Sequence, residues 1–253
     1  METPARGCAP WPDGCRGAVS ITFDDGLDSQ IELALPLLGS YGLRATFYVN
    51  PTGRRWEKNL AAWQRASQAG HEVGNHSISH TCSRSFRDLE GDTPSLETIT
   101  LDDVERDILA AEERLNAAFP GQGRRSFAYP CYQDYVGDGA HRQSYVPIVS
   151  RHMLAGRGRG EVANSPGTCE LAYLWSWPSE RVPGVALIGM AETCAAQGRW
   201  GVYTFHGIGE GHLPIPPYDF EELLRHLAAS RERIWVAPVA EVAQRILTWR
   251  KGT

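Results

Sequence analysis

The chain has 253 residues, of which 42% are hydrophobic and 22% charged, and its formal net charge is -5. This length and composition predict one soluble globular domain over residues 1–253, with its core at about residues 18–245. The mildly acidic balance excludes nucleic acid and membranes as expected partners, because no basic field is present to attract phosphates or anionic lipids.

Short apolar runs rich in β-branched and aromatic residues predict strands, and longer amphipathic segments between them predict helices. In chain order, strands are expected at residues 18–23, 45–49, 127–129, 202–205 and 234–236, and helices at 31–41, 60–69, 101–119, 220–230 and 239–249. Capping signals mark two helix starts, at Thr100 and at Asp219. Because parallel strands need helical crossovers, this alternation predicts an α/β fold with a mostly parallel sheet.

Two polar segments, residues 81–98 and 156–167, are predicted to be long loops, which in compact domains more often carry function than not. Residues 1–17 contain no apolar run behind a basic segment, and no window approaches the length of a membrane span. We therefore expect a cytoplasmic protein, although a secreted chain trimmed of its signal would have the same sequence pattern.

The six cysteines are scattered without a CxxC pair, which argues against a structural zinc site. Without an export signal, we expect most of them to be reduced and to act as small core residues. They are Cys8, Cys15, Cys82, Cys131, Cys169 and Cys194.

Two adjacent carboxylates, Asp24 and Asp25, follow the first predicted strand in the run Thr22-Phe23-Asp24-Asp25-Gly26. Two neighbouring negative charges repel each other unless a positive charge lies beside them, and a metal ion would supply it. The alternative is a helix cap followed by an ordinary Asp-Asp-Gly turn.

A pair of histidines, His76 and His80, is spaced i and i+4, so on a helical turn both imidazoles would lie on one face and converge on one ion. Position 77 is Ser, so the zinc-protease motif H-E-x-x-H is absent. Two histidines and one aspartate leave an open position for water, as in catalytic zinc sites, and the second aspartate would be the base.

These motifs, together with the late run Val202-Tyr203-Thr204-Phe205-His206, resemble the polysaccharide deacetylase family, the NodB-homology carbohydrate esterases of family 4. Order and spacing agree from about Val19 to Val242. The resemblance implies a metal-dependent hydrolase of acetyl groups. It also implies a distorted, incomplete (β/α) barrel in a single domain, with its site at the carboxyl ends of the strands.

By this resemblance Asp24 would be the general base and His206 the general acid, while Asp25, His76 and His80 would hold the metal. We expect the metal to be Zn²⁺, with Co²⁺ or Ni²⁺ as alternatives. His206 is supported independently, because it ends an apolar strand before a glycine-rich loop. His212, in that loop, is the rival acid.

The segment from Arg125 to Tyr132 resembles a family motif in which an Arg holds the catalytic Asp and an aromatic residue follows the Pro, but Ala128 and Cys131 occupy those places here. The backbone N–H of Cys131 is a candidate oxyanion donor, because a main-chain group does not depend on the side chain. We predict that Arg151, which follows the apolar stretch 145–150 and is expected at the end of a strand, supplies the missing charge. Further candidates for oxyanion or substrate contact are Tyr132, Trp175 and Trp177.

The expected substrate is an acetylated carbohydrate carrying N-acetyl or O-acetyl groups. The alternatives are hydrolysis of another small amide, such as a formyl or cyclic ureide group, and a non-catalytic sugar-binding relative. A non-haem iron oxygenase also uses two histidines and a carboxylate, but the second aspartate has no role in one, and strand-helix alternation does not suit a jelly roll.

Overall fold

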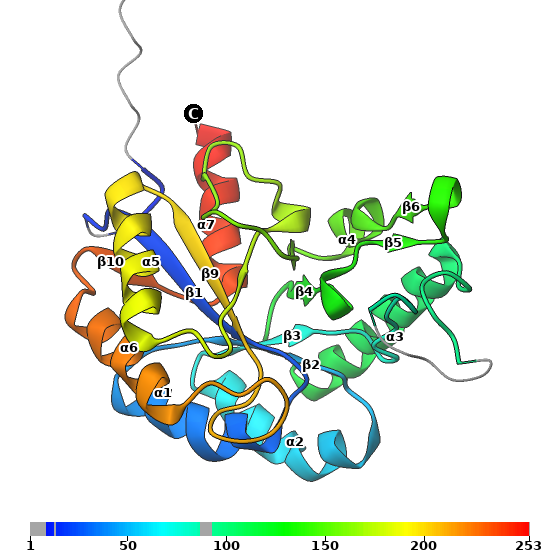
Figure 1. The fold of residues 1–253 in the computed structure, drawn as a ribbon, viewed down its shortest axis with the longest axis horizontal. Coiled ribbons are helices and arrows are strands. Elements are labelled where there is room, and N and C mark those ends of the chain that lie inside the picture. Colours follow the sequence, from blue (N-terminus) through cyan, green and yellow to red (C-terminus); the bar gives the residue numbers. More distant parts are fainter. Residues whose placement is uncertain (1–8, 13, 87–92, 253) are drawn as a thin grey trace, which may run out of the picture.

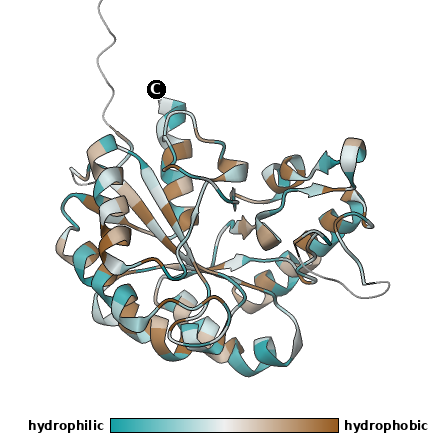
Figure 2. Cartoon of the chain, viewed as in Figure 1, coloured by the Kyte–Doolittle hydropathy of each residue, from teal (hydrophilic) through white to brown (hydrophobic). Residues whose placement is uncertain are grey.

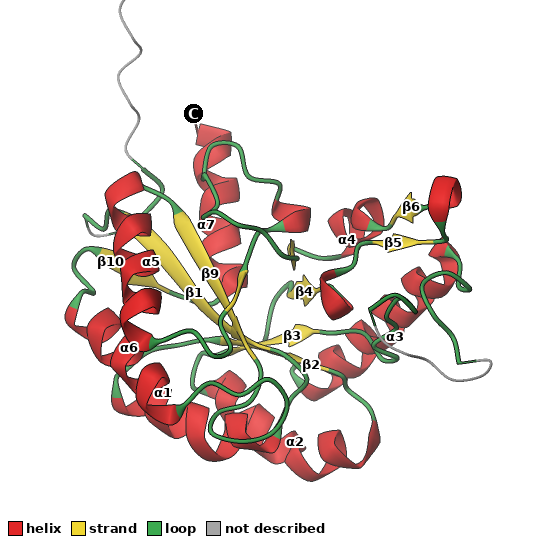
Figure 3. Ribbon diagram, in the orientation of Figure 1, coloured by secondary structure: helices red, strands yellow, loops and turns green. Residues whose placement is uncertain are grey.

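The computed structural model describes residues 9–12, 14–86 and 93–252, and a parallel sheet runs through them (Figure 1 and Figure 3). The strand order is β7-β4-β3-β2-β1-β9-β8, with β10 beside the first half of β1, and every pairing is parallel. The strands are β1 (Gly17–Phe23), β2 (Thr46–Val49), β3 (Glu72–Asn75), β4 (Ser126–Ala128), β7 (Ala155–Arg157), β8 (Trp177–Pro178), β9 (Trp200–Phe205) and β10 (Ile234–Val236). A separate antiparallel pair joins β5 (Tyr135–Val136) to β6 (Gln143–Ser144).

Helices connect these strands. They are α1 (Leu35–Ser40), preceded by a π-helical turn (Gln30–Ala34), α2 (Gly53–Gln68), α3 (Leu101–Ala118), α4 (Val146–His152), α5 (Gly184–Gln197), α6 (Pro217–Ala229) and α7 (Val239–Gly252), with short 3-10 turns at Pro130–Tyr132, Gly139–His141 and Leu171–Tyr173. Within the described ranges, no helix combines the length and apolar character needed to cross a bilayer.

The five predicted strands and five predicted helices are all present, and all except the strand at 234–236 have at least one shifted end. The capping box at Thr100 is confirmed, because its side chain accepts a hydrogen bond from the Asp103 N–H at 3.2 Å. Asp219 does not cap its own helix; it lies inside α6 and accepts the Gly184 N–H, at the start of α5, at 2.8 Å.

Seven helices and strands were missed or misassigned, among them the two-residue strands β5, β6 and β8. β3 lacks an apolar run, and α5 was not predicted at all. The predicted loop 156–167 begins inside β7, and the apolar stretch before Arg151 is helix α4 rather than a strand. The predicted loop 81–98 contains no regular element in its described part, and residues 87–92 of it lie outside the described residues.

Alternate residues of the strands face opposite sides of the sheet. In β1, Val19, Ile21 and Phe23 pack with apolar residues of α1, α2, α5 and α6 in one large core. Figure 1 shows these helices gathered on one side of the strands, and Figure 2 shows apolar segments in them. The helical layer therefore takes the odd-numbered face of β1.

The even-numbered face of β1 is largely polar and lies inside the barrel. Ser20 donates to the Ala237 carbonyl and Thr22 to the Tyr203 carbonyl, both at 2.7 Å. Across the interior, the hydroxyls of Tyr48 and Ser126 lie 2.7 Å apart. Buried hydroxyls are costly unless they are paired, and these hydroxyls have partners.

The strand pairing of the barrel is least regular between β7 and β8. Here a single bridge from Arg157 to Leu174 and a few main-chain hydrogen bonds replace a regular ladder, including Gly158 N–H to the Leu174 carbonyl at 2.8 Å. The predicted distorted, incomplete barrel in a single domain is thus confirmed, and the distortion lies at this seam.

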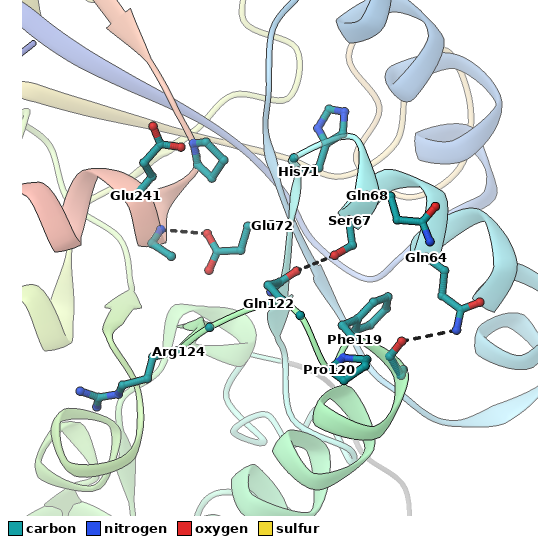
Figure 4. A pocket seen from close by; sticks show the side chains of 16 residues that line it. Gln64, Ser67, Gln68, His71, Glu72, Phe119, Pro120, Gln122, Arg124 and Glu241 are labelled. Atoms are coloured by element: carbon teal, nitrogen blue, oxygen red, sulfur yellow. Dashed lines mark hydrogen bonds between the residues drawn. The ribbon is translucent and has the colours of Figure 1, made fainter.

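The amino ends of the strands are tied together by Glu72, which is buried at 4% exposure. Its carboxylate accepts hydrogen bonds from the N–H and hydroxyl of Ser126, both at 2.7 Å, and from the Thr46 hydroxyl and the Ala240 N–H, both at 2.9 Å. Ala240 lies in the first turn of α7, where a negative charge is favourable. Figure 4 shows Glu72 at the wall of a surface hollow that Glu241 also lines.

Replacing Glu72 with alanine should lower the free energy of unfolding by roughly 2–4 kcal/mol, because several buried donors lose their acceptor. The matched control is Glu241→Ala in the same hollow. Its exposed ion pair with Arg44 should contribute less than about 1 kcal/mol. Urea unfolding followed by circular dichroism measures both, and equal losses would contradict the role of Glu72.

Candidate active site

Asp24 and His206 are brought together by the register of β1 and β9. Phe23 pairs with Phe205, so the next residue of each strand lies at the same end of the sheet, and the Asp24 N–H donates to the Phe205 carbonyl at 3.0 Å. The Asp24 Oδ2 lies 3.8 Å from His206 Nε2 and 4.0 Å from His76 Nε2. Because parallel strands end together, three segments distant in sequence meet at one carboxyl-end site.

The expected metal ligands form a compact cluster. The Asp25 Oδ1 lies 3.5 Å from His76 Nε2 and 3.4 Å from His80 Nε2. Ligands about 2.1 Å from a tetrahedral ion lie about 3.4 Å from one another, so these spacings fit a zinc-like ion. The His76 Nδ1 lies 2.9 Å from the Ala128 carbonyl, which orients the ring so that Nε2 points toward Asp25.

The electrostatics of this cluster also suit a cation. Burial alone would raise the pKa of Asp25, but its hydrogen bond to His76 and the charges of the nearby imidazoles lower it below its usual range. Burial alone would lower the pKa of His76, but Asp24 and Asp25 raise it. Burial and the charge of His76 lower the pKa of His80 to about 4. The two carboxylates thus draw positive charge to the site.

The two histidines do not lie on a helical turn, so that part of the prediction was wrong. They follow β3 in a loop, in which His80 has a φ of 49°. The Asn50 amide donates to the His76 carbonyl at 2.5 Å, Ser77 Oγ accepts the His80 N–H at 3.0 Å, and Asp107 from α3 accepts loop N–H groups at 3.2 Å. A folded loop, rather than helical spacing, makes the imidazoles converge.

Left-handed backbone is concentrated here. Of the seven non-glycine residues with positive φ among the described residues, five lie at this site. They are Asp25, Ser77, His80, Cys131 and Tyr132. Such conformations cost energy outside glycine and persist where the surrounding structure holds them, as at functional sites.

The charge beside Asp24 comes from Arg157, not from Arg151. Nη2 of Arg157 lies 2.5 Å from both carboxylate oxygens of Asp24, and the Arg157 side chain is fully buried. Arg151 is instead a surface residue of α4, 62% exposed and paired with Glu105 at 3.0 Å. Arg157 is the register partner of Ala128 across β4 and β7, so the guanidinium reaches the site from the neighbouring strand.

The guanidinium of Arg157 is enclosed by aromatic rings. Its Cζ lies 5.3 Å from the Tyr48 ring centre and 5.2 Å from that of Tyr132. Among the described residues, its Nε and Nη1 have no hydrogen-bond partner. The buried charge is therefore compensated by Asp24 and by the two ring faces, which fixes the orientation of the carboxylate.

A second positioning residue, Gln30, was missed at the sequence level. Its buried amide nitrogen donates to the Asp24 carbonyl at 2.5 Å and to the His206 carbonyl at 3.1 Å. It therefore bridges the main chains of both residues. No sequence pattern marks this role, because it depends on the contact between two strand ends.

His206 is the more enclosed of the two candidate acids. It is 8% exposed, and burial lowers its pKa despite the opposing charge of Asp24. His212 is exposed, and its ring centre lies 5.6 Å from that of His206. The exposure of His212 agrees with the preference for His206 as the candidate acid.

Cys131 departs from the expectation of reduced cysteines, because it forms a disulfide with Cys82, with Cα atoms 5.9 Å apart. The bond joins the loop after β3 to the turn after β4, two segments that the sequence does not connect. Cys15, Cys169 and Cys194 form no disulfide, as predicted for most cysteines, and Cys8 lies outside the described residues.

The two candidate tryptophans differ. The ring of Trp177 packs 5.4 Å from that of Tyr203 against the main core, and its indole N–H donates to the Glu161 carbonyl, so the structure gives it a packing role. Trp175 is 45% exposed, while its backbone is fixed by Asn164, so it remains a candidate for sugar contact.

The fold is an incomplete parallel barrel, and two aspartates and three histidines meet at the carboxyl ends of its strands. This combination of fold and site defines the structural class of the protein. A family model described as polysaccharide deacetylase matches residues 12–143, just over half of the chain. The chain belongs to the polysaccharide deacetylase family, as its motifs predicted.

Individual relatives are more distant. A peptidoglycan-N-acetylglucosamine deacetylase of Bacillus cereus is 36% identical over 77 residues, which are 29% of this chain. The match spans 35% of that relative, about a third of its length.

Two solved structures share the fold. A Mycobacterium smegmatis protein provisionally assigned as a polysaccharide deacetylase has a TM-score of 0.63 at 16% identity, covering 98% of this chain and 96% of that chain. A family 4 acetyl xylan esterase from Clostridium thermocellum, in complex with a cobalt ion, has a TM-score of 0.54 at 18% identity, covering 93% and 92%. At these identities the likeness concerns the fold alone.

Zinc binding to the oxidised protein should depend on the ligand cluster. We expect His76→Ala and Asp25→Ala each to weaken it by at least roughly 100-fold, because each removes one of three ligand atoms. His212→Ala is the matched control and should bind as the wild type does. Isothermal calorimetry of chelator-treated protein measures the three affinities, and retained binding in either ligand variant would disprove the assignment.

Proposed function

We propose that this protein is a metal-dependent deacetylase that hydrolyses acetyl groups, primarily N-acetyl groups, on a carbohydrate substrate. The observation that carries this proposal is the position of Asp24. Its carboxylate is fixed by Arg157 and lies 3.8–4.0 Å from the His206 and His76 Nε2 atoms, beside the cluster of Asp25, His76 and His80. Base, acid and metal-type ligands are therefore within one small site.

The proposed metal is Zn²⁺, with Co²⁺ or Ni²⁺ as alternatives, and when bound it would polarise the acetyl carbonyl and acidify water. Asp24 then removes the proton from the attacking water, since Arg157 holds its oxygens toward the site. His206, whose Nε2 lies 3.8 Å from the Asp24 carboxylate, protonates the departing nitrogen or oxygen. The Cys131 N–H donates to the developing oxyanion, and the products are acetate and a free amine or hydroxyl.

A carbohydrate is the proposed substrate class for two reasons. The family is that of polysaccharide deacetylases, and the Bacillus cereus relative is a peptidoglycan-N-acetylglucosamine deacetylase. In addition, the exposed ring of Trp175 offers a face on which a sugar can stack. The complete set of base, positioning Arg, ligands and acid argues against a purely sugar-binding relative.

An acetate-release screen tests this proposal. Chelated and zinc-restored protein would be offered N-acetylglucosamine oligomers, peptidoglycan fragments, acetylated xylan and, as the competing class, formylated and cyclic ureide small molecules. We expect acetate from acetylated carbohydrate only with metal restored, and no formate or ring-opened product from the small amides, which are measured alongside. Hydrolysis confined to the small amides, or turnover unaffected by chelation, would contradict the proposal.

The two arginines provide a matched test of the positioning role. Arg157→Lys keeps the buried charge but removes the planar fork, so kcat should fall on the order of 10- to 100-fold while zinc affinity stays within a few-fold. Arg151→Ala removes only a surface ion pair and should leave kcat unchanged. Steady-state kinetics with zinc calorimetry separates the effects, and equal kcat values would remove Arg157 from the mechanism.

A further inference from the structure

The imidazole of His80 faces two different groups. Its Nε2 lies 3.4 Å from the Asp25 carboxylate, within the cluster described above. Its Nδ1 lies 3.7 Å from the sulfur of Cys82, which is disulfide-bonded to Cys131. The ring therefore separates a hard, oxygen- and nitrogen-rich site from a pair of sulfur atoms.

The sulfur side has the composition of a metal site of its own. His80, Cys82 and Cys131 each offer one ligand atom, and these atoms all lie within 4.8 Å of one another. Zinc bound by thiolate sulfur at about 2.3 Å and imidazole nitrogen at about 2.0 Å keeps such ligands about 3.5–3.8 Å apart, which matches the Nδ1 to sulfur distance of 3.7 Å. As a disulfide, however, the sulfurs offer no thiolate.

The two loops are also held together by contacts that do not involve the sulfurs. The Ser83 N–H donates to the Gln133 side chain at 2.8 Å, directly joining the segment after Cys82 to the segment after Cys131. The Leu96 N–H donates to the Cys82 carbonyl at 3.2 Å, and the Leu96 carbonyl accepts the Gly137 N–H, from the segment after Cys131, at 2.7 Å. Breaking the disulfide therefore leaves both thiols next to His80.

We propose that the Cys82–Cys131 disulfide is reducible, and that its reduced form, together with His80 Nδ1, binds a second, soft divalent cation such as Zn²⁺. A small dithiol reductant would supply two electrons and two protons, becoming a disulfide itself while the S–S bond of the protein is converted to two thiols. Cation binding then releases the two thiol protons and, when both sites are filled, the remaining ring proton of His80, whose imidazolate would bind one cation through each nitrogen. Reductant reaches the bond from Cys131, which is partly exposed, whereas Cys82 is buried.

This second site shares one imidazole with the proposed catalytic centre but uses the opposite ring nitrogen. The redox state of the two cysteines would thereby be coupled to a residue that holds the catalytic metal. The sulfur site itself does not depend on the proposed deacetylation, so a spectroscopic test can fail or succeed independently of the activity screen.

Cobalt is the probe, because Co²⁺ bound to thiolate shows intense sulfur-to-metal charge-transfer absorption in the near ultraviolet, whereas oxygen and nitrogen ligands do not produce it. Full-length protein would be titrated with CoCl₂ before and after reduction by a dithiol that is then removed without air. We expect the band only after reduction, together with one additional cobalt ion bound per chain.

Cysteine variants test which residues give rise to the absorption band. Cys82→Ser and Cys131→Ser should each abolish it, and Cys169→Ser, which removes a thiol outside the cluster, should retain it. Circular dichroism of each reduced protein checks that the fold persists. A folded, reduced wild type without the band, or a band that survives in Cys82→Ser, would overturn the proposal.

Discussion

The interior of the barrel is polar, and each group that a strand directs into it must be satisfied by another strand. Hydroxyls on β1, β2, β4 and β9 meet this requirement with main-chain carbonyls or with each other. At the carboxyl ends the requirement becomes electrostatic, because Asp24 is buried at 4% exposure and needs a compensating charge. Arg157 provides it, and the orientation of Asp24, the proposed base, follows from that pair.

Two buried carboxylates at opposite ends of the barrel illustrate how surroundings decide function. Glu72 accepts hydrogen bonds from several fixed donors, including two backbone N–H groups, so its oxygens are occupied and it joins strands to α7. Both carboxylate oxygens of Asp24 accept hydrogen bonds from one guanidinium nitrogen of Arg157. The carboxylate also lies 3.8–4.0 Å from the imidazoles of His76 and His206. The first arrangement stabilises the fold, whereas the second leaves the Asp24 carboxylate, among the described residues, with hydrogen bonds from Arg157 alone, as suits the proposed base.

The loop that carries His80 is held both by hydrogen bonds and by a covalent link. Left-handed backbone at Ser77 and His80 is held by Asn50 and Asp107, which come from other elements. The same loop is covalently linked through Cys82 to the turn that carries the candidate oxyanion donor, Cys131. A change in this link would therefore act on two parts of the site together.

The sequence by itself determined the family, the α/β barrel class and those candidate site residues that lie in short motifs. Asp24 and Asp25 are adjacent, His76 and His80 are four residues apart, and His206 directly ends a strand, so short-range patterns contain them. The strands with alternating or continuous apolar residues were also predicted, but β3 was not, because its inward face carries Glu72 and a glycine rather than an apolar run.

Only the tertiary structure decided which residues support these motifs. Arg157 replaces the expected charge because β7 lies beside β4 with Arg157 opposite Ala128, a register set by hydrogen bonds between distant segments. Gln30 and the Cys82–Cys131 bond likewise depend on which strand ends and loops meet. Such contacts join residues up to 176 positions apart, and no local periodicity encodes them, because they arise when the sheet closes around a shared interior.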